Sequence, residues 1–358
     1  MVGLGRALTL ESTTPEAIAD VRRAWEAAPA SSTDNGAPSP VLFASFAFRS
    51  PARSVAFVPA LTLIDEAGAR WAITAGIGDA PDPLAAVDEA RPSPRAPESL
   101  TFGHGSMSRT QWRDSVRAMA QRLREGAADK AVMARDMTVR CAHGFDERFL
   151  LERLSDLYPS TWRFCVDSLV GASPEMLIAA SGGTASSRVL AGTCKPGEGE
   201  MLASSAKDLR EHDLASKSVS SVLTRLCTSV TAQGPFLLSL PNVVHLATDV
   251  HARLGQAHLL DLVAALHPTA AVCGTPRDAA MRLIEQLEDT ERGRYSGPVG
   301  WVDTAGDGEF AIALRCGLTS GTRLRLFAGA GIMPDSDPDA ELAETEAKMR
   351  PLLDALGV

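Results

Sequence analysis

Carboxylates stand at the edge of apolar helix faces in two distant parts of the sequence. Glu341 and Glu344 lie in the first turns of 338–356, where apolar residues recur at helical spacing, and Glu211 borders a similar stripe. Burying a carboxylate is costly unless something pairs with it. Oxygen ligands from separate elements are typical of Mg²⁺ sites. The pattern is compatible with a magnesium site, but Glu344, four residues before Lys348, equally fits an ordinary helix ion pair.

Other residues that could do chemistry are ambiguous when taken singly. Lys130 opens a predicted strand, where a lysine is more often a surface residue than a general base. His245 lies in an apolar strand, where a hydrogen-bonded core histidine is the commoner case. The glycine-rich runs 190–200 and 328–332 lack the order of a Walker or dinucleotide-binding motif. Both could still bring backbone N–H groups close to an anion.

Bulk composition argues against several classes of protein. The 358 residues carry a net charge of −9 and 5% aromatic side chains, with no basic stretch, so we expect no nucleic-acid partner. The six cysteines form no CxxC pair, which predicts reduced thiols in a cytoplasmic protein. The most apolar stretch is interrupted by Asp261, His267 and Pro268, so no segment is predicted to span a membrane.

The elements that must position these residues combine hairpins with long helices. The block 297–332 alternates apolar strands, one of them 310–319, with Gly- and Asp-containing turns, as antiparallel hairpins do. The segment 163–181 is predicted as two strands joined by a turn at 171–174. Without a regular strand–helix–strand series, the pattern predicts an α+β fold with helices outside antiparallel sheets. The predicted helices are 108–126, 204–230, 258–266, 276–291 and 338–356, and 130–140 is a predicted strand.

A series of motifs resembles the chorismate-utilising enzyme family. The motifs are "GASPEML" (171–177), "LAGT" (190–193), "KDLREHDL" (207–214), "HLATDV" (245–250), "LHPTAAVCGTPRDAA" (266–280), "ERGRYSGPVGWVD" (291–303), "GEFAIALRCG" (308–317), "LFAGAGI" (326–332) and "ELAETEAKM" (341–349). They follow the family's order and spacing. The resemblance implies a single large domain over 1–358 with a core of two antiparallel β-sheets, in which 1–100 is divergent and 101–358 is the motif-bearing catalytic part.

Within the family the resemblance is strongest to isochorismate synthases, which move a hydroxyl group from C4 to C2 of the chorismate ring. By motif position Lys130 matches the base that activates water, and Glu175 matches the general acid. Glu211 and Glu344 match the Mg²⁺ carboxylates, with Glu341 in the same cluster. The resemblance therefore implies a magnesium-dependent isomerase in which the ion neutralises a substrate carboxylate.

The resemblance also implies a set of substrate contacts. Arg315 and Tyr295 match residues that bind the enolpyruvyl carboxylate. Ala271 stands where amine-transferring and salicylate-forming relatives carry threonine, and a small residue there leaves room for water. As a departure, Pro196 stands where relatives have an arginine soon after "LAGT", and Lys195 comes one position before it. The remaining matched positions are Gly192, Thr193, Gly329 and Gly331 for close backbone approach, Lys348 for positive charge, and His245 beside the ring.

Three functions stay open on the sequence alone. The first is an isochorismate synthase whose product enters menaquinone or siderophore synthesis. The second is a relative that makes salicylate or an aminated ring, but Lys130 argues against amination and Ala271 against both. The third is a catalytically silent protein that binds a chorismate-like ligand, which the intact set of matched acids and base disfavours. The resemblance further implies a monomer whose partner is a small molecule.

Overall fold

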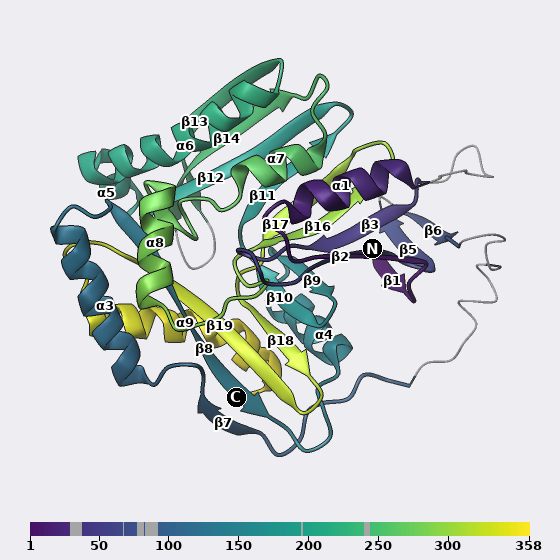
Figure 1. Ribbon diagram of the computed structural model, residues 1–358, viewed down its shortest axis with the longest axis horizontal. Helices are drawn as coiled ribbons and strands as arrows, with labels where there is room; N and C mark the ends of the chain where they lie inside the picture. Colours follow the sequence, from purple (N-terminus) through teal and green to yellow (C-terminus); the bar gives the residue numbers. More distant parts are fainter. Residues whose placement is uncertain (29–37, 67, 77–81, 83–91, 195, 240–243) are drawn as a thin grey trace.

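Antiparallel sheets form the centre of the computed structural model (Figure 1). The structure describes residues 1–28, 38–66, 68–76, 82, 92–194, 196–239 and 244–358. Within these ranges the first sheet has the order β13 (Ser229–Ser239), β14 (Val244–Arg253), β12 (Thr184–Cys194), β11 (Met176–Ser181), β17 (Gly308–Ile312), β16 (Pro298–Asp303), β3 (Val41–Ser45), β4 (Ser54–Val58) and β2 (Leu8–Ser12). The second sheet has the order β15 (Gly274–Thr275), β8 (Lys130–Arg140), β19 (Arg323–Ile332), β18 (Cys316–Ser320), β10 (Leu169–Ser173) and β9 (Trp162–Val166), and β7 (Thr101–His104) also pairs with β8.

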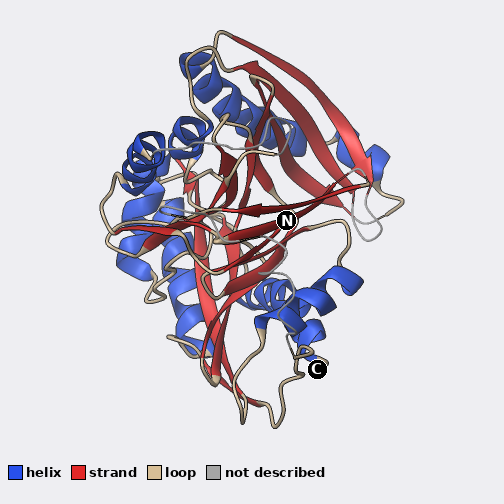
Figure 2. Cartoon of the chain, turned by 90° about the vertical axis from the view of Figure 1, so that its right-hand side faces the viewer, coloured by secondary structure: helices blue, strands red, loops and turns tan. Residues whose placement is uncertain are grey.

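Helices pack against the sheets and leave some strands open on one side (Figure 2). α6 packs on β12, β13 and β14 of the first sheet, whereas α9 packs on β19 and α8 on β8 of the second. The predicted α+β class with two antiparallel sheets is confirmed, and a small third sheet of β1 (Val2–Leu4), β5 (Leu61–Glu66) and β6 (Ala69–Thr74) is added to it. The described helices are α1 (Ala17–Ala27), α3 (Arg109–Arg124), α4 (Glu147–Leu157), α5 (Gly199–Ser204), α6 (Ala206–Leu226), α7 (Leu259–Leu266), α8 (Arg277–Leu287) and α9 (Pro338–Leu356).

Local sequence explains where α3 begins and where α9 begins and ends. The Gln111 N–H donates to the Ser108 hydroxyl (3.2 Å) and the Ser108 N–H donates to the Gln111 side chain (2.9 Å), which is a capping box. α9 begins after Asp337, whose carboxylate accepts hydrogen bonds from the first turn, and ends before Gly357 at a φ of +80°. These signals are local, and both helices match their predicted ranges.

Apolar clusters fill the space between the sheets and the helices. The largest joins both sheets to α1, α3, α7 and α8 and contains the fully buried Trp112 and Phe310. A second cluster, which includes Leu150, packs α4 and α9 on the second sheet. A third lies where the two sheets meet, around Tyr295 and Phe327. The junction of the sheets is therefore a packed region that can hold side chains in fixed positions.

At two points in the described part of the chain, it passes between the two large sheets with no helix between the strands that it joins. β10 belongs to the second sheet and β11 to the first, so the chain crosses at Pro174 and Glu175. β17 belongs to the first sheet and β18 to the second, so the chain crosses back over 313–315. Both crossings lie at the junction of the sheets.

Three sequence predictions about these strands are wrong. The turn predicted at 171–174 lies instead at Asp167 and Ser168, which have φ values of +49° and +65°. The single strand predicted over 310–319 is interrupted by the crossing between β17 and β18. The helix predicted over 204–230 ends earlier as α6, because the residues that follow pair with β14 as strand β13. In each case pairing with a distant strand prevails over the local apolar pattern.

The first hundred residues complete the first sheet. β3 pairs with β16 along Val41–Ser45, and β4 and β2 extend the sheet beyond it. The divergent and motif-bearing parts of the chain thus share one hydrogen-bonded sheet.

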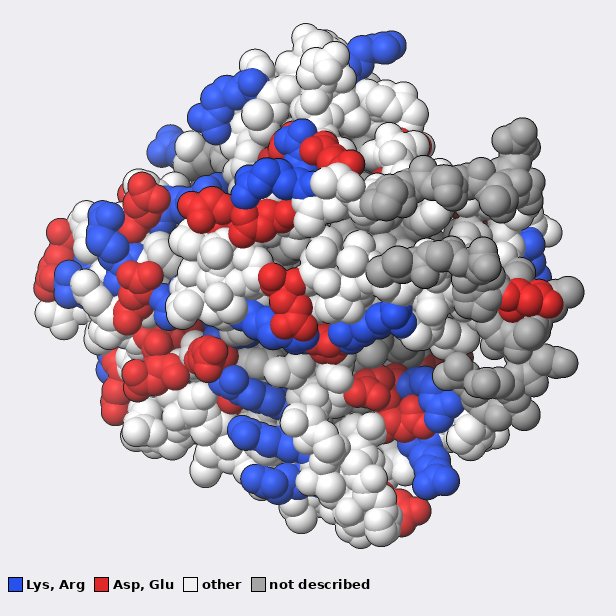
Figure 3. Space-filling view, turned by 45° about the vertical axis from the view of Figure 1, so that its right-hand side comes forward, with Lys and Arg blue, Asp and Glu red and all other residues white. Residues whose placement is uncertain are grey.

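Charges of both signs are interspersed on the molecular face shown in Figure 3. Among the described residues of that face, Lys and Arg form no broad cationic surface of the kind that a phosphate backbone needs. None of the described helices combines the length and apolar character that a membrane crossing requires.

Candidate active site

The two crossings bring Glu175 and Arg315 together. The Ile312 N–H donates to the Glu175 carbonyl (3.0 Å), and the Ala172 N–H donates to the Arg315 carbonyl (3.2 Å). The Ser173 hydroxyl links the two segments by donating to the Ile312 carbonyl (2.6 Å). Arg315 has a φ of +49°, a left-handed conformation that non-glycine residues adopt rarely and that is often found at functional sites. The backbone that carries both side chains is therefore held in place.

Glu175 has a carboxyl group whose ionisation its surroundings oppose. Burial raises its pKa above the ordinary glutamate value, while the charges of Arg315, Lys130 and Lys348 act to lower it. These three cations must lie near the carboxyl to act on it, so the structure brings four predicted site residues together. A carboxyl with a raised pKa retains its proton to higher pH and can serve as a general acid.

Arg315 lies among aromatic and acidic neighbours. Burial lowers the pKa of its guanidinium, and Tyr295, Glu175 and Glu344 raise it. The buried Tyr295 ring stacks on Phe327 with centroids 5.1 Å apart. Burial raises the pKa of the Tyr295 hydroxyl to about 12, so this group stays protonated and can donate a hydrogen bond. A guanidinium beside a phenol hydroxyl can bind a carboxylate.

Two glycines of β19 provide the surface on which these side chains lie. A Cβ atom on Gly331 would lie 2.8 Å from Cε of Lys130, and one on Gly329 would lie 3.1 Å from the Tyr295 hydroxyl. The Lys348 ammonium donates to the Gly329 carbonyl (3.0 Å). A side chain at position 331 would shift the end of the Lys130 side chain, and one at position 329 would crowd the Tyr295 hydroxyl, so glycine at both positions leaves these two groups where they are.

Glu341 and Glu344 lie one turn apart on α9. The Ser336 hydroxyl donates to Glu341 (2.7 Å), and the Lys348 ammonium pairs with Glu344. Burial raises the pKa of Glu341, and the negative charge of Glu344 raises it further. Two carboxylates that repel each other in this way favour a cation beside them, so this part of the predicted magnesium site fits a dication.

The third predicted metal ligand lies on α6. The structure describes the backbone of Glu211, but its side chain lies outside the described residues, as does that of Thr193. Among the side chains that the structure does describe, no group of three His, Cys, Asp or Glu residues is close enough to hold a metal ion. The magnesium ligand set of Glu211, Glu341 and Glu344 therefore stays a prediction.

His245 and the run from Gly192 to Thr193 meet in the pairing of β12 with β14. Thr193 lies opposite His245, next to a bulge that follows Leu190. Gly192 has a φ of +82°, which favours glycine, and its backbone is a hydrogen-bond partner of His245. Burial lowers the pKa of the His245 imidazole, so the ring is neutral at physiological pH.

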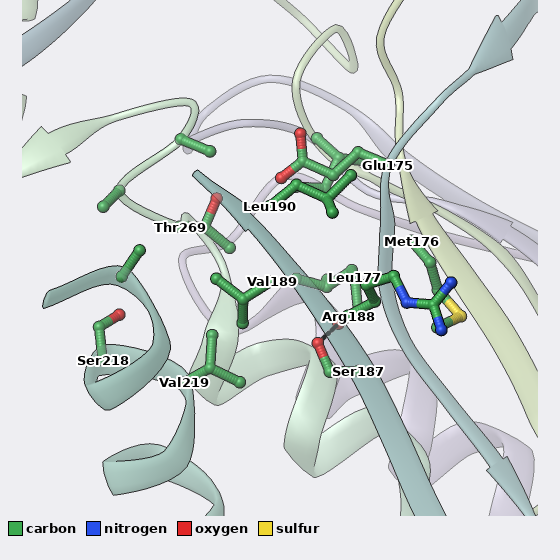
Figure 4. A pocket seen from close by; sticks show the side chains of 14 residues that line it. Glu175, Met176, Leu177, Ser187, Arg188, Val189, Leu190, Ser218, Val219 and Thr269 are labelled. Atoms are coloured by element: carbon green, nitrogen blue, oxygen red, sulfur yellow. Dashed lines mark hydrogen bonds between the residues drawn. The ribbon is translucent and has the colours of Figure 1, made fainter. Parts of the chain in front are cut away.

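A cavity of about 50 Å³ opens beside Glu175 (Figure 4). Thr269 and Ala271, from the segment before β15, line it together with apolar residues of β11, β12 and α6. The Thr269 hydroxyl is buried without a hydrogen-bond partner. The volume accommodates water, and a larger side chain at position 271 would reduce it. Ala271 therefore keeps space open next to the acid.

Sequence reasoning missed the role of a second charged pair close to these residues. Glu288 and Arg292 form two hydrogen bonds of 2.7 Å and are almost completely buried. The only signal in the sequence is a glutamate four residues before an arginine, which equally fits a surface pair. The burial that gives this pair its importance is a property of the fold.

The fold and this group of residues define a known class of protein. The chain belongs to the chorismate binding enzyme family, whose model matches residues 1–357.

Two curated relatives are similar over most of the chain. It is 35% identical to the isochorismate synthase MenF of Bacillus subtilis over 265 residues, which are 70% of this chain and 56% of that protein. It is also 35% identical to the isochorismate synthase DhbC of the same organism over 269 residues, 69% of this chain and 68% of that protein. The matched stretch thus spans little more than half the length of the first relative.

A solved structure has the same fold. The match to MenF, the menaquinone-specific isochorismate synthase from Escherichia coli, has a TM-score of 0.81 and covers 99% of this chain and 85% of that one. At 24% identity, this similarity shows the fold alone.

Proposed function

We propose that the protein is an isochorismate synthase that converts chorismate to isochorismate. The observation that carries the proposal is the position of Glu175, a carboxyl with a raised pKa that lies within range of Lys130, Arg315 and Lys348. An acid, a base and cations for a dicarboxylate are the groups that this exchange of hydroxyls requires. The two curated relatives, both isochorismate synthases, support the same reaction.

The proposed reaction uses the acid and the base on different oxygens. Lys130, as the general base, takes a proton from a water molecule as that water forms the new C–O bond at C2. Glu175 gives its proton to the C4 hydroxyl, which leaves as water as the ring double bonds shift. One water is consumed and one is released, so the product is an isomer of the substrate. Each turnover ends with Lys130 protonated and Glu175 ionised, and solvent resets both.

The substrate carboxylates determine the roles of the remaining residues. Arg315 and Tyr295 would bind the enolpyruvyl carboxylate, with Lys348 adding positive charge. Glu211, Glu341 and Glu344 would hold Mg²⁺, which when bound neutralises the other carboxylate. Gly329 and Gly331 keep the backbone of β19 close to the ligand. By the family resemblance, the substrate would also contact Gly192, Thr193, His245 and Ala271.

Ala271 and Lys130 favour isomerisation over the related reactions of the family. The space beside Ala271 accommodates the attacking water, and an amine base to activate that water lies near Glu175. The identity to MenF equals the identity to DhbC, so this comparison supports the reaction and leaves the pathway of the product open.

Product analysis tests the proposal. The protein is incubated with chorismate and Mg²⁺, with and without ammonia, and the products are separated by chromatography. Isochorismate without pyruvate is expected, whereas prompt salicylate with pyruvate, or an aminated ring, would contradict the proposal. Lys130→Ala and Glu175→Gln should each abolish turnover while circular dichroism stays unchanged. A near-normal rate in either variant would remove that residue from the mechanism.

A further inference from the structure

One edge of β8 is completed by side chains where no strand pairs with it. Along its other edge β8 pairs with β19 from Ala131 to Arg140. On this edge β15 pairs with its first two residues and β7 with its last four. Between them, Glu288 accepts a hydrogen bond from the Ala134 N–H (2.6 Å), and Arg292 donates to the Val132 carbonyl (2.7 Å). A buried ion pair thus occupies the place of a neighbouring strand.

The Arg292 guanidinium has several partners at once. Nε and Nη2 each donate to Glu288 (2.7 Å), Nη2 also donates to Val132, and Nη1 donates to the Val272 carbonyl (2.8 Å). Its centre lies 4.1 Å from the centroid of the Phe48 ring. The side chains of Arg292 and Glu288 are 3% and 1% exposed, so their bonds form away from solvent. The Arg292 guanidinium, which is always charged, is therefore also held in one position.

These contacts join three segments that carry predicted site residues. Val132 lies two residues after Lys130 on β8, and Val272 directly follows Ala271. The Tyr295 N–H donates to the Arg292 carbonyl (3.0 Å), so the turn that carries Tyr295 starts from the same residue. The Val132 N–H also donates to the Cys273 carbonyl (2.8 Å), and β15 pairs with Lys130. The Arg292 side chain therefore acts together with these main-chain bonds to hold the strand of the base against the segment that lines the cavity.

We infer that Arg292, oriented by Glu288, is a positioning residue that holds Lys130 at the correct distance from the Ala271 segment and from the water between them. The inference rests on the proposed function, because it assumes that Lys130 is the base. Arginine is required because its planar fork reaches the carboxylate and two separate carbonyls together. A lysine supplies the charge but cannot span all three acceptors. Misplacing a reacting group by about 1 Å can cost about 10²-fold in rate.

Arg292→Lys tests the inference, with Arg325→Lys as the matched control. Arg325 also pairs with a buried carboxylate on β8, that of Asp136, which lies six residues after Lys130. Both variants are expected to lower the melting temperature. Arg292→Lys should lower kcat by about 10²-fold and leave KM for chorismate within about threefold, whereas Arg325→Lys should keep kcat within about twofold of the parent. Equal effects of the two variants on kcat would overturn the inference.

A second variant covers the case in which Arg292→Lys does not fold. Glu288→Gln keeps the shape and an oxygen for the Ala134 N–H but removes the charge that orients Arg292. It should lower kcat with KM little changed, and an unchanged kcat would overturn the inference. Lys130→Ala in the same assay separates the two proposals, because a near-normal rate there refutes the base itself. An inactive Lys130→Ala beside a normal Arg292→Lys refutes only the positioning role.

Discussion

Two glutamate–cation pairs in this molecule have the same sequence spacing and different surroundings. The side chains of Glu288 and Arg292 are 1% and 3% exposed and bond to main-chain groups of β8. Those of Glu344 and Lys348 are 48% and 27% exposed and lie beside Gly329 at the candidate site. The buried pair is part of the framework. The half-exposed pair can exchange its partners for a charged ligand at small cost, because water compensates each charge when the pair separates.

The largest effect on stability is expected from breaking the buried pair. Arg292→Met leaves the Glu288 carboxylate buried without its cation, which should cost about 3–5 kcal/mol of unfolding free energy. The double variant Glu288→Gln with Arg292→Met should recover much of that loss, since no charge is then stranded. Urea denaturation of the three proteins measures both values. A double variant no more stable than Arg292→Met would show that the main-chain bonds, rather than the charges, dominate.

A second prediction concerns the Glu175 carboxyl, whose pKa is raised by burial more than it is lowered by the neighbouring cations. Because the folded state raises the pKa of Glu175, ionising this group costs stability, at about 1.4 kcal/mol for each unit of pKa. Glu175→Gln should therefore be more stable than the parent at high pH. The difference should be absent below the ordinary glutamate pKa, grow as pH rises towards the raised value, and then level off. Thermal unfolding measured across pH tests this, and a gain independent of pH would contradict it.

The smallest stability effects are expected at the more exposed ion pairs. Two such pairs should differ in their effect on substrate binding. Lys348→Met and Lys217→Met each remove a cation four residues after a carboxylate on a helix, and each should change stability by less than about 0.5 kcal/mol. Lys348→Met should also raise KM for chorismate by roughly tenfold, about 1.4 kcal/mol of binding. Lys217→Met should leave KM unchanged. Equal KM values for the two variants would place Lys348 outside the substrate site.

Predictions from the sequence succeed where the determining signal is local. Ser108 and Gln111 mark the start of α3, and Asp337 and Gly357 mark the ends of α9, because a cap acts within one turn. The strand 130–140 has the same bounds in the structure as in the prediction. The crossings at Glu175 and Arg315 could not be predicted in this way, because switching sheets depends on partners more than a hundred residues distant.

The candidate site shows the same division. Taken singly, Lys130 fits a surface residue, and only the family resemblance places it in a site. The structure then brings it within range of Glu175 without any reference to that resemblance. The carboxylates of α9 were suggested by helical spacing, whereas the part of Glu211 stays a prediction. Arg292 was missed because its spacing from Glu288 is the same for a buried pair as for an exposed one.

The pairing of β3 with β16 has a practical consequence. A fragment limited to residues 101–358 would lack β3, so the N–H and C=O groups along one edge of β16 would lose their hydrogen-bond partners. Unpaired strand edges of this kind pair with strands of other chains and cause aggregation. The N-terminal part of the protein, which is poorest in recognisable motifs, therefore covers an edge strand of the catalytic part and prevents its aggregation.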